Sequence, residues 1–313
     1  MPGEAVDKNI SKKRIIFFGS EEMDFTSRHL DYFLKFNPNI VGFVVDTRGV
    51  RSTTVSKSST FKDIMKVAEE KDIPVFNPET VKNTGLVDDL KKLNPDIFIV
   101  CGYQFFLPEE IINLPPMGTL NFHASLLPRH SGMHPGFWTI YYGDKFSGMV
   151  IHFMDKGIDT GDVAYRSKVP VNPGDTIEVL YERIYDTCPG LIKQLMSDIE
   201  KDAIPRTPQN YADYIYNYEI TDSDFELDFR QPAQVLMGRV KMLSGKFYFV
   251  LDGEKYFVKD CTVFKEHVDA RKFETGKPYQ LDNKIFFVTP RSFFEIIQAE
   301  KDGQKVDLLS LIK

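Results

Sequence analysis

Residues 87–103 read VDDLKKLNPDIFIVCGY, and this stretch decides the fold of the first half of the chain. Residues 87–93 have the apolar spacing of a helix. That helix should end at Asn94, because a residue that precedes a proline disfavours helical geometry. The run that follows, residues 96–100, has apolar side chains at consecutive positions, which is typical of a parallel strand covered on both faces.

The same alternation of strands and helices extends through the first two hundred residues. β-Branched and aromatic runs predict strands at residues 14–18, 40–45, 96–100, 119–122 and 149–153. Helical patterns lie between them at residues 23–36, 60–71, 87–93 and 136–142. We therefore expect an α/β protein with a Rossmann-like, doubly wound and mostly parallel sheet.

The character of the chain changes near residue 202. One long helix is expected over residues 176–201, with Asp175 or Thr176 as its N-cap. The polar stretch that follows is rich in Tyr, Asn, Pro and Asp and is interpreted as a linker. Beyond a helix at residues 233–242, three turn signals predict β-hairpins, at Asp252-Gly253, Asp282-Asn283 and Asp302-Gly303. The expected division is a catalytic domain (1–202), a linker (203–230) and a small β-rich, barrel-like C-terminal domain (231–313).

The composition of the 313 residues is that of a globular protein, with 42% hydrophobic and 27% charged residues. The net charge of −6 does not favour nucleic-acid binding. Apolar runs fall short of the roughly 18–20 residues that cross a bilayer, and the polar opening MPGEAVDKNISKKR has no apolar signal segment. Three widely spaced cysteines, Cys101, Cys188 and Cys261, are expected to be reduced thiols. We expect a cytoplasmic protein without a membrane partner.

The first strand-to-helix turn reads FFGSEEMDF, residues 17–25. A dinucleotide site needs GxGxxG here, so that the backbone can approach a pyrophosphate. This turn has a single glycine, Gly19, and Glu21 and Glu22 would repel a phosphate. We therefore expect no NAD or FAD.

The residues suited to catalysis are concentrated in residues 118–162, GTLNFHASLLPRHSGMHPGFWTIYYGDKFSGMVIHFMDKGIDTGD. Asn121 and His123 are two apart, so on a strand they share a face, and they lie at its carboxyl end, where open α/β sheets bind ligands. An acidic loop follows, in which Asp155, Asp159 and Asp162 are rival carboxylates. An amide donor, an imidazole and a carboxylate suit acyl transfer to an amine.

The remaining histidines of this stretch are given structural interpretations. His130 and His134 are four apart, but they lie in a loop broken by Pro and Gly, and no HExxH pattern accompanies them. We expect solvated or acceptor-site histidines and no metal. His152 is interpreted as a packed strand residue, and Cys101 as buried and inert.

Asn121, His123, the run SLLP at residues 125–128 and the later DTG at residues 159–161 resemble the signature of the 10-formyltetrahydrofolate-dependent formyltransferases. The 38 positions between Asn121 and Asp159 fit that family's pattern. Residues 100–132 are similar to its methionyl-tRNA branch. The resemblance implies that Asn121 donates to an oxyanion, that His123 stabilises this charge and moves a proton, and that Asp159 holds the imidazole and raises its pKa.

The resemblance also implies a folate pocket beside the sheet and an acceptor site near it. The cosubstrate would be 10-formyltetrahydrofolate, and its pterin would contact Gly102, Tyr103, Phe105, Phe106, Leu107, Asp155 and Ile158. The basic loop of residues 46–58 invites contacts to an anionic acceptor. The acceptor residues expected are Ser20, Glu21, Arg48, Arg51 and His134.

The identity of the amine acceptor is the most open question. Residues 206–313 contain 16 Lys and Arg against 17 Asp and Glu, a net charge of about −1, which is a poor basis for gripping tRNA. RHSGMHPGFW after SLLP and RVKMLSGKFYF near residue 240 also depart from the tRNA-acting branch. We therefore favour a small or nucleotide-linked amine such as an amino sugar. Methionyl-tRNA is the alternative, and hydrolysis of formyl-folate and a non-catalytic binding module are the further ones.

Overall fold

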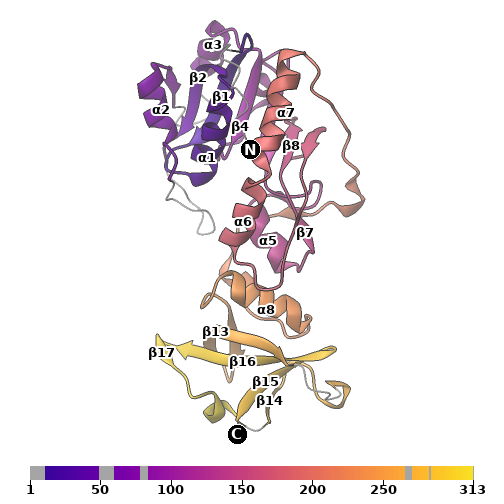
Figure 1. The fold of residues 1–313 in the computed structure, drawn as a ribbon. Helices are drawn as coiled ribbons and strands as arrows, with labels where there is room; N and C mark the ends of the chain where they lie inside the picture. Colours follow the sequence, from indigo (N-terminus) through magenta and orange to yellow (C-terminus); the bar gives the residue numbers. More distant parts are fainter. Residues whose placement is uncertain (1–10, 49–59, 78–83, 265–269, 282, 313) are drawn as a thin grey trace, which may run out of the picture. The chain divides into compact units, whose positions relative to one another are not determined.

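A seven-stranded sheet forms the centre of the N-terminal part of the protein (Figure 1). The computed structural model describes residues 11–48, 60–77, 84–264, 270–281 and 283–312. The strand order is β3-β2-β1-β4-β5-β8-β9, with pairs parallel from β3 to β5 and antiparallel from β5 to β9. The strands are β1 (Arg14–Ser20), β2 (Asn39–Asp46), β3 (Val75–Phe76), β4 (Ile97–Cys101), β5 (Thr119–His123), β8 (Val150–Phe153) and β9 (Val163–Arg166). The expected Rossmann-like, mostly parallel sheet is confirmed.

Helices were expected at four places between these strands, and the structure has a helix near each of them. They are α1 (Asp24–Leu34), α2 (Ile64–Lys71), α3 (Thr84–Lys92) and α5 (Pro135–Tyr141). The short helix α4 (Glu109–Ile112) was not expected. Local capping explains the bounds of α2. The Asp63 side chain accepts a hydrogen bond from the Met65 amide at the start, and Asp72 turns left-handed at the end with φ of 52°.

Large apolar side chains from neighbouring strands pack on one face of the sheet. Phe18 of β1 and Phe98 of β4 are fully buried, with ring centroids 5.0 Å apart, and Val44 and Val100 belong to the same cluster. Every residue of β4 is buried. Because both faces of this strand are covered, its sequence is apolar at consecutive positions rather than alternating.

The prediction of a single helix over residues 176–201 is wrong, because two helices occupy this stretch. They are α6 (Ile177–Tyr185) and α7 (Cys188–Glu200). Pro189 lies in the first turn of α7, where its missing N–H is tolerated, but a continuous helix through it would lose a hydrogen bond and clash with the preceding turn. Thr176 has the cap role, since its hydroxyl accepts from the Val179 amide.

The C-terminal sheet is antiparallel and confirms the three expected hairpins. After helix α8 (Ala233–Met242), strands pair in the order β12-β13-β16-β15-β14, with β17 added to β16. The bounds are β12 (Tyr248–Leu251), β13 (Glu254–Phe264), β14 (Pro278–Leu281), β15 (Lys284–Thr289), β16 (Ser292–Lys301) and β17 (Gln304–Lys305). Positive φ at the Asp-Gly turns matches the twist of the hairpins. Asp282 is outside the described residues. Where the chain is described, the strand order is an open path rather than a closed barrel.

The chain divides into two compact units. One comprises Met1–Pro135, Gly148–Val169 and Arg183–Asn217, and the other Gly136–Ser147, Pro170–Glu182 and Tyr218–Lys313. These units cut across the expected boundaries at residues 202 and 230. The expected linker carries short elements of its own: η1 (Tyr211–Asp213), β11 (Tyr216–Asn217) and η2 (Asp222–Phe225). None of the described helices has the length and apolar character needed to span a membrane.

A buried histidine on α1 makes stability depend on pH. His29 is fully buried among Phe25, Phe122 and Tyr185, and burial lowers its pKa to about 4. Between pH 6.5 and 4 His29 binds a proton in the unfolded chain but not in the folded chain. Its contribution to stability is therefore complete above pH 6.5 and falls on acidification.

We expect acidification from pH 7.5 to 4.5 to cost the wild type about 2–3 kcal/mol more unfolding free energy than it costs His29→Phe. Urea unfolding of both proteins at the two pH values measures the difference. An equal loss in both proteins would show that His29 does not carry this dependence.

Candidate active site

Asn121 and His123 lie at the carboxyl end of β5, on one face of the strand. β5 pairs with β8 in antiparallel register, and Asn121 is directly opposite His152. Residues opposite each other in such a pair have side chains on the same face. The Asn121 Nδ2 atom is 3.1 Å from His152 Nε2. The register of β5 and β8 therefore adds a second histidine to the two residues expected from sequence.

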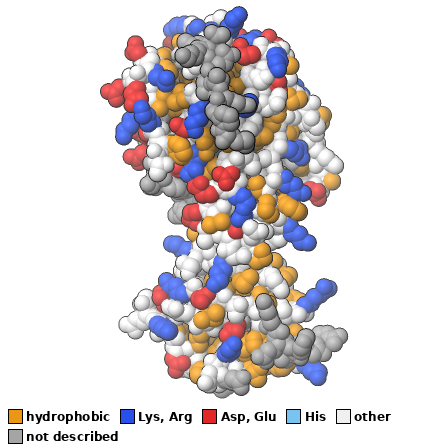
Figure 2. All heavy atoms as spheres, viewed as in Figure 1, with side chains coloured by type: hydrophobic (Ala, Val, Ile, Leu, Met, Phe, Trp, Pro, Cys, Tyr) orange, Lys and Arg blue, Asp and Glu red, His pale blue; other side chains and the backbone are white. Residues whose placement is uncertain are grey.

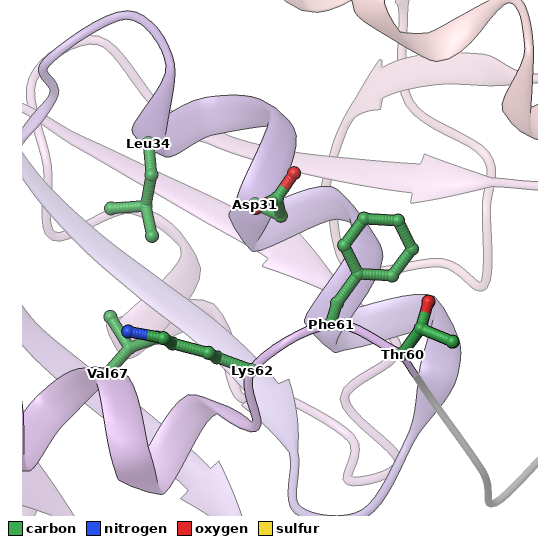
Figure 3. Close-up of a pocket in the computed structure, with 6 residues that line it drawn as sticks. All are labelled: Asp31, Leu34, Thr60, Phe61, Lys62 and Val67. Carbon is green, nitrogen blue, oxygen red and sulfur yellow. The ribbon is translucent and has the colours of Figure 1, made fainter.

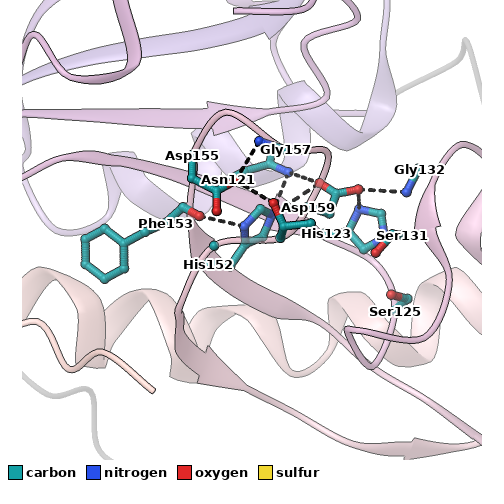
Figure 4. Close-up of polar contacts among 12 residues, drawn as sticks. Asn121, His123, Ser125, Ser131, Gly132, His152, Phe153, Asp155, Gly157 and Asp159 are labelled. Carbon is teal, nitrogen blue, oxygen red and sulfur yellow. Dashed lines mark hydrogen bonds and ion pairs between the residues drawn. The ribbon is translucent and has the colours of Figure 1, made fainter. Parts of the chain in front are cut away.

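Asp159 lies between these side chains, in the loop that joins β8 to β9 (Figure 4). Its Oδ1 is 3.3 Å from both Asn121 Nδ2 and His152 Nε2, and its Oδ2 is 3.4 Å from His123 Nδ1. The Gly132 amide donates to Oδ2 at 2.8 Å. One carboxylate thus contacts the amide, both imidazoles and a backbone N–H, and the structure brings Asn121, His123 and Asp159 together.

The hydrogen bonds of the two histidines define their tautomers. His123 Nε2 lies 2.7 Å from the His130 carbonyl, which can only accept, so Nε2 carries the proton and Nδ1 faces Asp159. His152 Nδ1 donates in the same way to the Phe153 carbonyl at 2.9 Å. His152 Nε2, when the ring is neutral, therefore accepts from the Asn121 amide.

Burial and charge act in opposite directions on the pKa values of this cluster. Burial lowers the pKa of His123, and the Asp159 carboxylate acts against it without reversing it. Asp159 therefore acts on the pKa of His123 in the expected direction. Burial outweighs it, because His123 is only 7% exposed and its ring loses its hydration. Burial acts to raise the pKa of Asp159, but His123, His152 and the Gly132 amide hold it well below its usual value. Asp159 is thus a carboxylate at neutral pH.

The loop residues near Asp159 have distinct local roles. Asp155 Oδ1 accepts from the Gly157 amide at 2.9 Å and from the Thr160 hydroxyl at 2.6 Å, so it caps the loop and is not the carboxylate of the cluster. Ile158 is exposed. Asp159 itself has a φ of 54°, a left-handed backbone that is uncommon outside glycine and aspartate or asparagine.

The residues expected to contact the pterin follow β4. Gly102 has a φ of 73°, which only glycine adopts at low cost. Phe106 is 62% exposed, whereas Leu107 is buried in the core. The Tyr103 hydroxyl is buried and has no hydrogen-bond partner within the described ranges, a vacant polar atom that fits a polar heterocycle.

The residues expected at an acceptor site differ from one another in burial and in the contacts that they make. Ser20 is buried, and its hydroxyl donates to the Gly102 carbonyl at 2.6 Å. The pKa of Glu21 is raised, first by partial burial and then by the carboxylates of Asp63 and Glu22. Arg48 is held by Asp46, with contacts of 2.9 and 2.7 Å, and its guanidinium lies 3.1 Å from the Phe105 ring centroid. His134 is half-buried with a φ of 52°, and Arg51 is outside the described residues.

Sequence reasoning missed His152 and misjudged His130. His130 was expected to be a solvated or an acceptor-site histidine, but it is 2% exposed and its carbonyl holds His123. His152 does pack in its strand, and it also contacts Asn121 and Asp159. Side chains alternate between the two faces along β8. If the register of β8 on β5 had been known, this alternation would have placed His152 on the same face as Asn121.

Other features of the described chain do not compete with this cluster. The residues that the structure describes contain no group of His, Cys, Asp and Glu arranged to hold a metal ion. A surface pocket of about 180 Å³ lies between α1 and α2 (Figure 3), lined by Asp31, Leu34, Thr60, Phe61, Lys62 and Val67. None of these six residues belongs to the Asp159 cluster.

An amide donor and two imidazoles gathered on one carboxylate, at the carboxyl edge of an α/β sheet, are an arrangement suited to an acyl-transfer enzyme. Residues 13–195 match the model of the formyl transferase family. The chain is 33% identical to the methionyl-tRNA formyltransferase of Pseudoalteromonas translucida (strain TAC 125), over 74% of this chain and 71% of that protein. It is 30% identical to that of Sulfurihydrogenibium sp. (strain YO3AOP1), over 82% of each. The chain belongs to the formyl transferase family and transfers a formyl group from 10-formyltetrahydrofolate.

Solved structures show the same fold at lower identity. The sugar 3N-formyl transferase WlaRD, crystallised with dTDP and 5-N-formyl-THF, has a TM-score of 0.64 at 16% identity, covering 93% of this chain and 98% of its own. The N-formyltransferase of Helicobacter canadensis, in complex with folinic acid and dTDP-3-aminofucose, has a TM-score of 0.64 at 18% identity, covering 92% and 99%. These likenesses show that the fold is shared along most of both chains.

Proposed function

We propose that the acceptor is a small or nucleotide-linked primary amine such as an amino sugar, and that Asn121, His123 and Asp159 carry the reaction. The observation that carries this site is the position of the Asp159 carboxylate, within 3.4 Å of Asn121 and of two histidines. Asp159 is a carboxylate at neutral pH, so it can accept a proton from an approaching ammonium group. Because its pKa is held low, it gives that proton up readily to the leaving nitrogen.

In the proposed reaction, the ammonium group of the acceptor loses a proton before the new carbon–nitrogen bond forms. Asp159 accepts it, and the freed amine lone pair attacks the formyl carbon. The carbon–oxygen π electrons move to the oxygen and give a tetrahedral oxyanion. When the oxyanion collapses, the bond to N10 of the folate breaks and N10 takes the proton held by Asp159. The nitrogen of the new formamide loses its second proton to solvent. Tetrahydrofolate and the formamide are the products, so no metal or covalent enzyme intermediate is required.

Asn121 and His123 respond to the protonation of Asp159. In the resting cluster one N–H of Asn121 is directed at Asp159 and the other at His152. Once Asp159 is protonated it is a weaker acceptor, so the Asn121 N–H is released to the developing oxyanion. His123 keeps its Nε2 proton on the His130 carbonyl, and its Nδ1 lies 3.4 Å from Asp159 Oδ2. Nδ1 can therefore accept a hydrogen bond from Asp159 once that carboxyl is protonated.

Charge supports a small acceptor over tRNA. On the face shown in Figure 2, Lys and Arg side chains are interspersed with Asp and Glu and form no broad basic area. The chain carries a net charge of −6. A phosphate backbone is bound mainly by lysine and arginine, whereas Glu21 and Glu22 near the first turn suit an ammonium group.

Methionyl-tRNA is the second candidate, and the curated relatives favour it. Proteins named methionyl-tRNA formyltransferase match this chain at 30–33% identity. The sugar N-formyltransferases match it at 16–18% identity but cover more than nine-tenths of it.

We also propose a division of the chain into domains and a location for the protein in the cell. The family match over residues 13–195 supports residues 1–202 as the catalytic domain, followed by a linker (203–230) and a C-terminal β domain (231–313). Three buried free thiols are compatible with a cytoplasmic location.

Tetrahydrofolate release from 10-formyltetrahydrofolate tests the acceptor. The enzyme is assayed alone, with a panel of nucleotide-linked amino sugars, and with methionylated initiator tRNA. We expect one amino sugar to raise the rate at least about tenfold over the rate without acceptor, because binding positions the amine against the formyl carbon. Stimulation by the tRNA alone would transfer the assignment to methionyl-tRNA. A full rate without any acceptor would identify a hydrolase.

A further inference from the structure

Residues 207–217, which the sequence suggested to be a linker, contact both loops that form the catalytic cluster. We call this segment the strap. One loop, residues 155–162, carries Asp159. The other, residues 125–134, supplies the His130 carbonyl that holds His123 and the Gly132 amide that holds Asp159. Thr207 begins the strap by exchanging two backbone hydrogen bonds with Val163, of 2.8 and 2.9 Å.

Gln209 is the strap residue that holds the Asp159 loop. Its side-chain amide donates to the carbonyls of Asp159 and Gly161, at 2.8 and 2.7 Å. The Gln209 side chain is buried, so these two hydrogen bonds are sheltered from water. Next along the strap, the Tyr211 hydroxyl donates to the Thr160 carbonyl. Three consecutive carbonyls around the catalytic aspartate are therefore fixed from the strap.

The far end of the strap holds the second loop. β11 pairs in parallel with β6 (Ser131–Gly132), and the Ser131 and Met133 amides donate to the carbonyls of Ile215 and Asn217. The Asn217 side-chain amide lies 3.2 Å from His130 Nδ1. This ladder fixes the segment from which His130 and Gly132 reach His123 and Asp159.

The strap holds two left-handed residues of the cluster. Asp159 has a φ of 54° and His130 a φ of 62°, a conformation that aspartate adopts more readily than histidine. The hydrogen bonds from Gln209 fix the carbonyls of Asp159 and Gly161, and so the direction in which the Asp159 side chain leaves the loop. We propose that Gln209 is a positioning residue for formyl transfer, which acts through Asp159 by holding its backbone in this conformation. This proposal rests on the proposed catalytic role of Asp159.

The test is steady-state tetrahydrofolate release by Gln209→Ala and by Gln209→Glu, with the acceptor that stimulates the wild type. Gln209→Glu keeps the shape of the side chain but puts a carboxylate oxygen in place of the N–H donors. It therefore retains the packing, loses both hydrogen bonds and adds repulsion between this oxygen and the two carbonyls. We expect kcat to fall about 10- to 100-fold in both, because a misplacement of about 1 Å has an effect of that size. The KM for 10-formyltetrahydrofolate should stay within about threefold. Gln194→Ala is the matched control, because Gln194 is on α7 and bonds only to the surface carboxylate of Asp198 in the described contacts.

A double-mutant cycle with Asp159→Asn separates positioning from general destabilisation. If Gln209 acts through Asp159, Gln209→Ala should change kcat less than about twofold in the Asp159→Asn background. If Gln209→Ala lowers kcat as much in the Asp159→Asn background as in the wild type, the proposal is overturned. It is also overturned if Gln209→Glu keeps the wild-type rate while Asp159→Asn loses it. A wild-type rate in Asp159→Asn itself would instead overturn the proposed site. The thermal unfolding of each variant is measured beside the assays, and it gives the fraction of protein that is folded. If kcat falls only as much as this folded fraction falls, the positioning role is contradicted.

Discussion

Asp159→Asn is expected to lower kcat for formyl transfer by about 10²–10⁴-fold. The substitution keeps the size of the side chain but removes the charge that, in the proposed reaction, takes the ammonium proton. The KM for 10-formyltetrahydrofolate should change little, because Asp159 makes its contacts with Asn121, His123 and His152. Tetrahydrofolate release, measured with the stimulating acceptor over a range of folate concentrations, separates the two constants.

Asp72→Asn is a matched control for this prediction. Asp72 ends α2 with a φ of 52°, nearly the backbone of Asp159 at 54°, and it is exposed on the surface. The same substitution in the same backbone conformation should leave kcat unchanged. Equal kcat values for Asp159→Asn and the wild type would remove Asp159 from the reaction.

Asn121→Ala is expected to lower kcat by about 10²–10³-fold, which is the usual cost of losing one oxyanion donor. Alanine keeps the strand backbone of β5 but cannot donate to the formyl oxygen. The loss should appear in kcat, because the donor is released to the oxyanion only after Asp159 is protonated. Single-turnover rates with saturating 10-formyltetrahydrofolate report this step directly.

The control for Asn121 is Asn39→Ala. Asn39 begins β2, and because β2 runs in the direction of β5, it lies at the opposite edge of the sheet from the catalytic cluster. Its replacement should leave kcat intact. A change in the folate KM alone for Asn121→Ala, with a retained single-turnover rate, would contradict the role of an oxyanion donor and indicate a binding role.

Several parts of the site could be predicted from local sequence. Asn121 and His123 are two residues apart on a strand, so they had to share a face. The apolar run at β4, and the helix that ends before it at Asn94-Pro95, predicted a parallel sheet. Because neighbouring strands of a parallel sheet run in the same direction, their carboxyl ends lie at one edge. The Asp-Gly hairpins were equally local, because the turn residues themselves adopt the positive φ that a hairpin needs.

Other parts could not be predicted, because they depend on which segments meet. His152 joins the cluster through the register of β8 on β5, and a shift of one residue would turn it to the other face. His130 acts through its carbonyl, so its side-chain type carried no signal. Arg48 was expected to face an anionic acceptor, but its pairing with Asp46 and its stacking on Phe105 follow from neighbours that only folding supplies.

The sequence by itself determined the α/β class, the mostly parallel sheet and the strand face that presents Asn121 and His123, because these follow from residue order, periodicity and turn chemistry. The resemblance carried by the DTG run already implied Asp159 rather than Asp155. Tertiary structure alone decided that His152 is beside that face and that the strap at residues 207–217 supports both loops. The reason is physical: propensities act over a few residues, whereas register and loop packing are set by contacts between segments tens of residues apart.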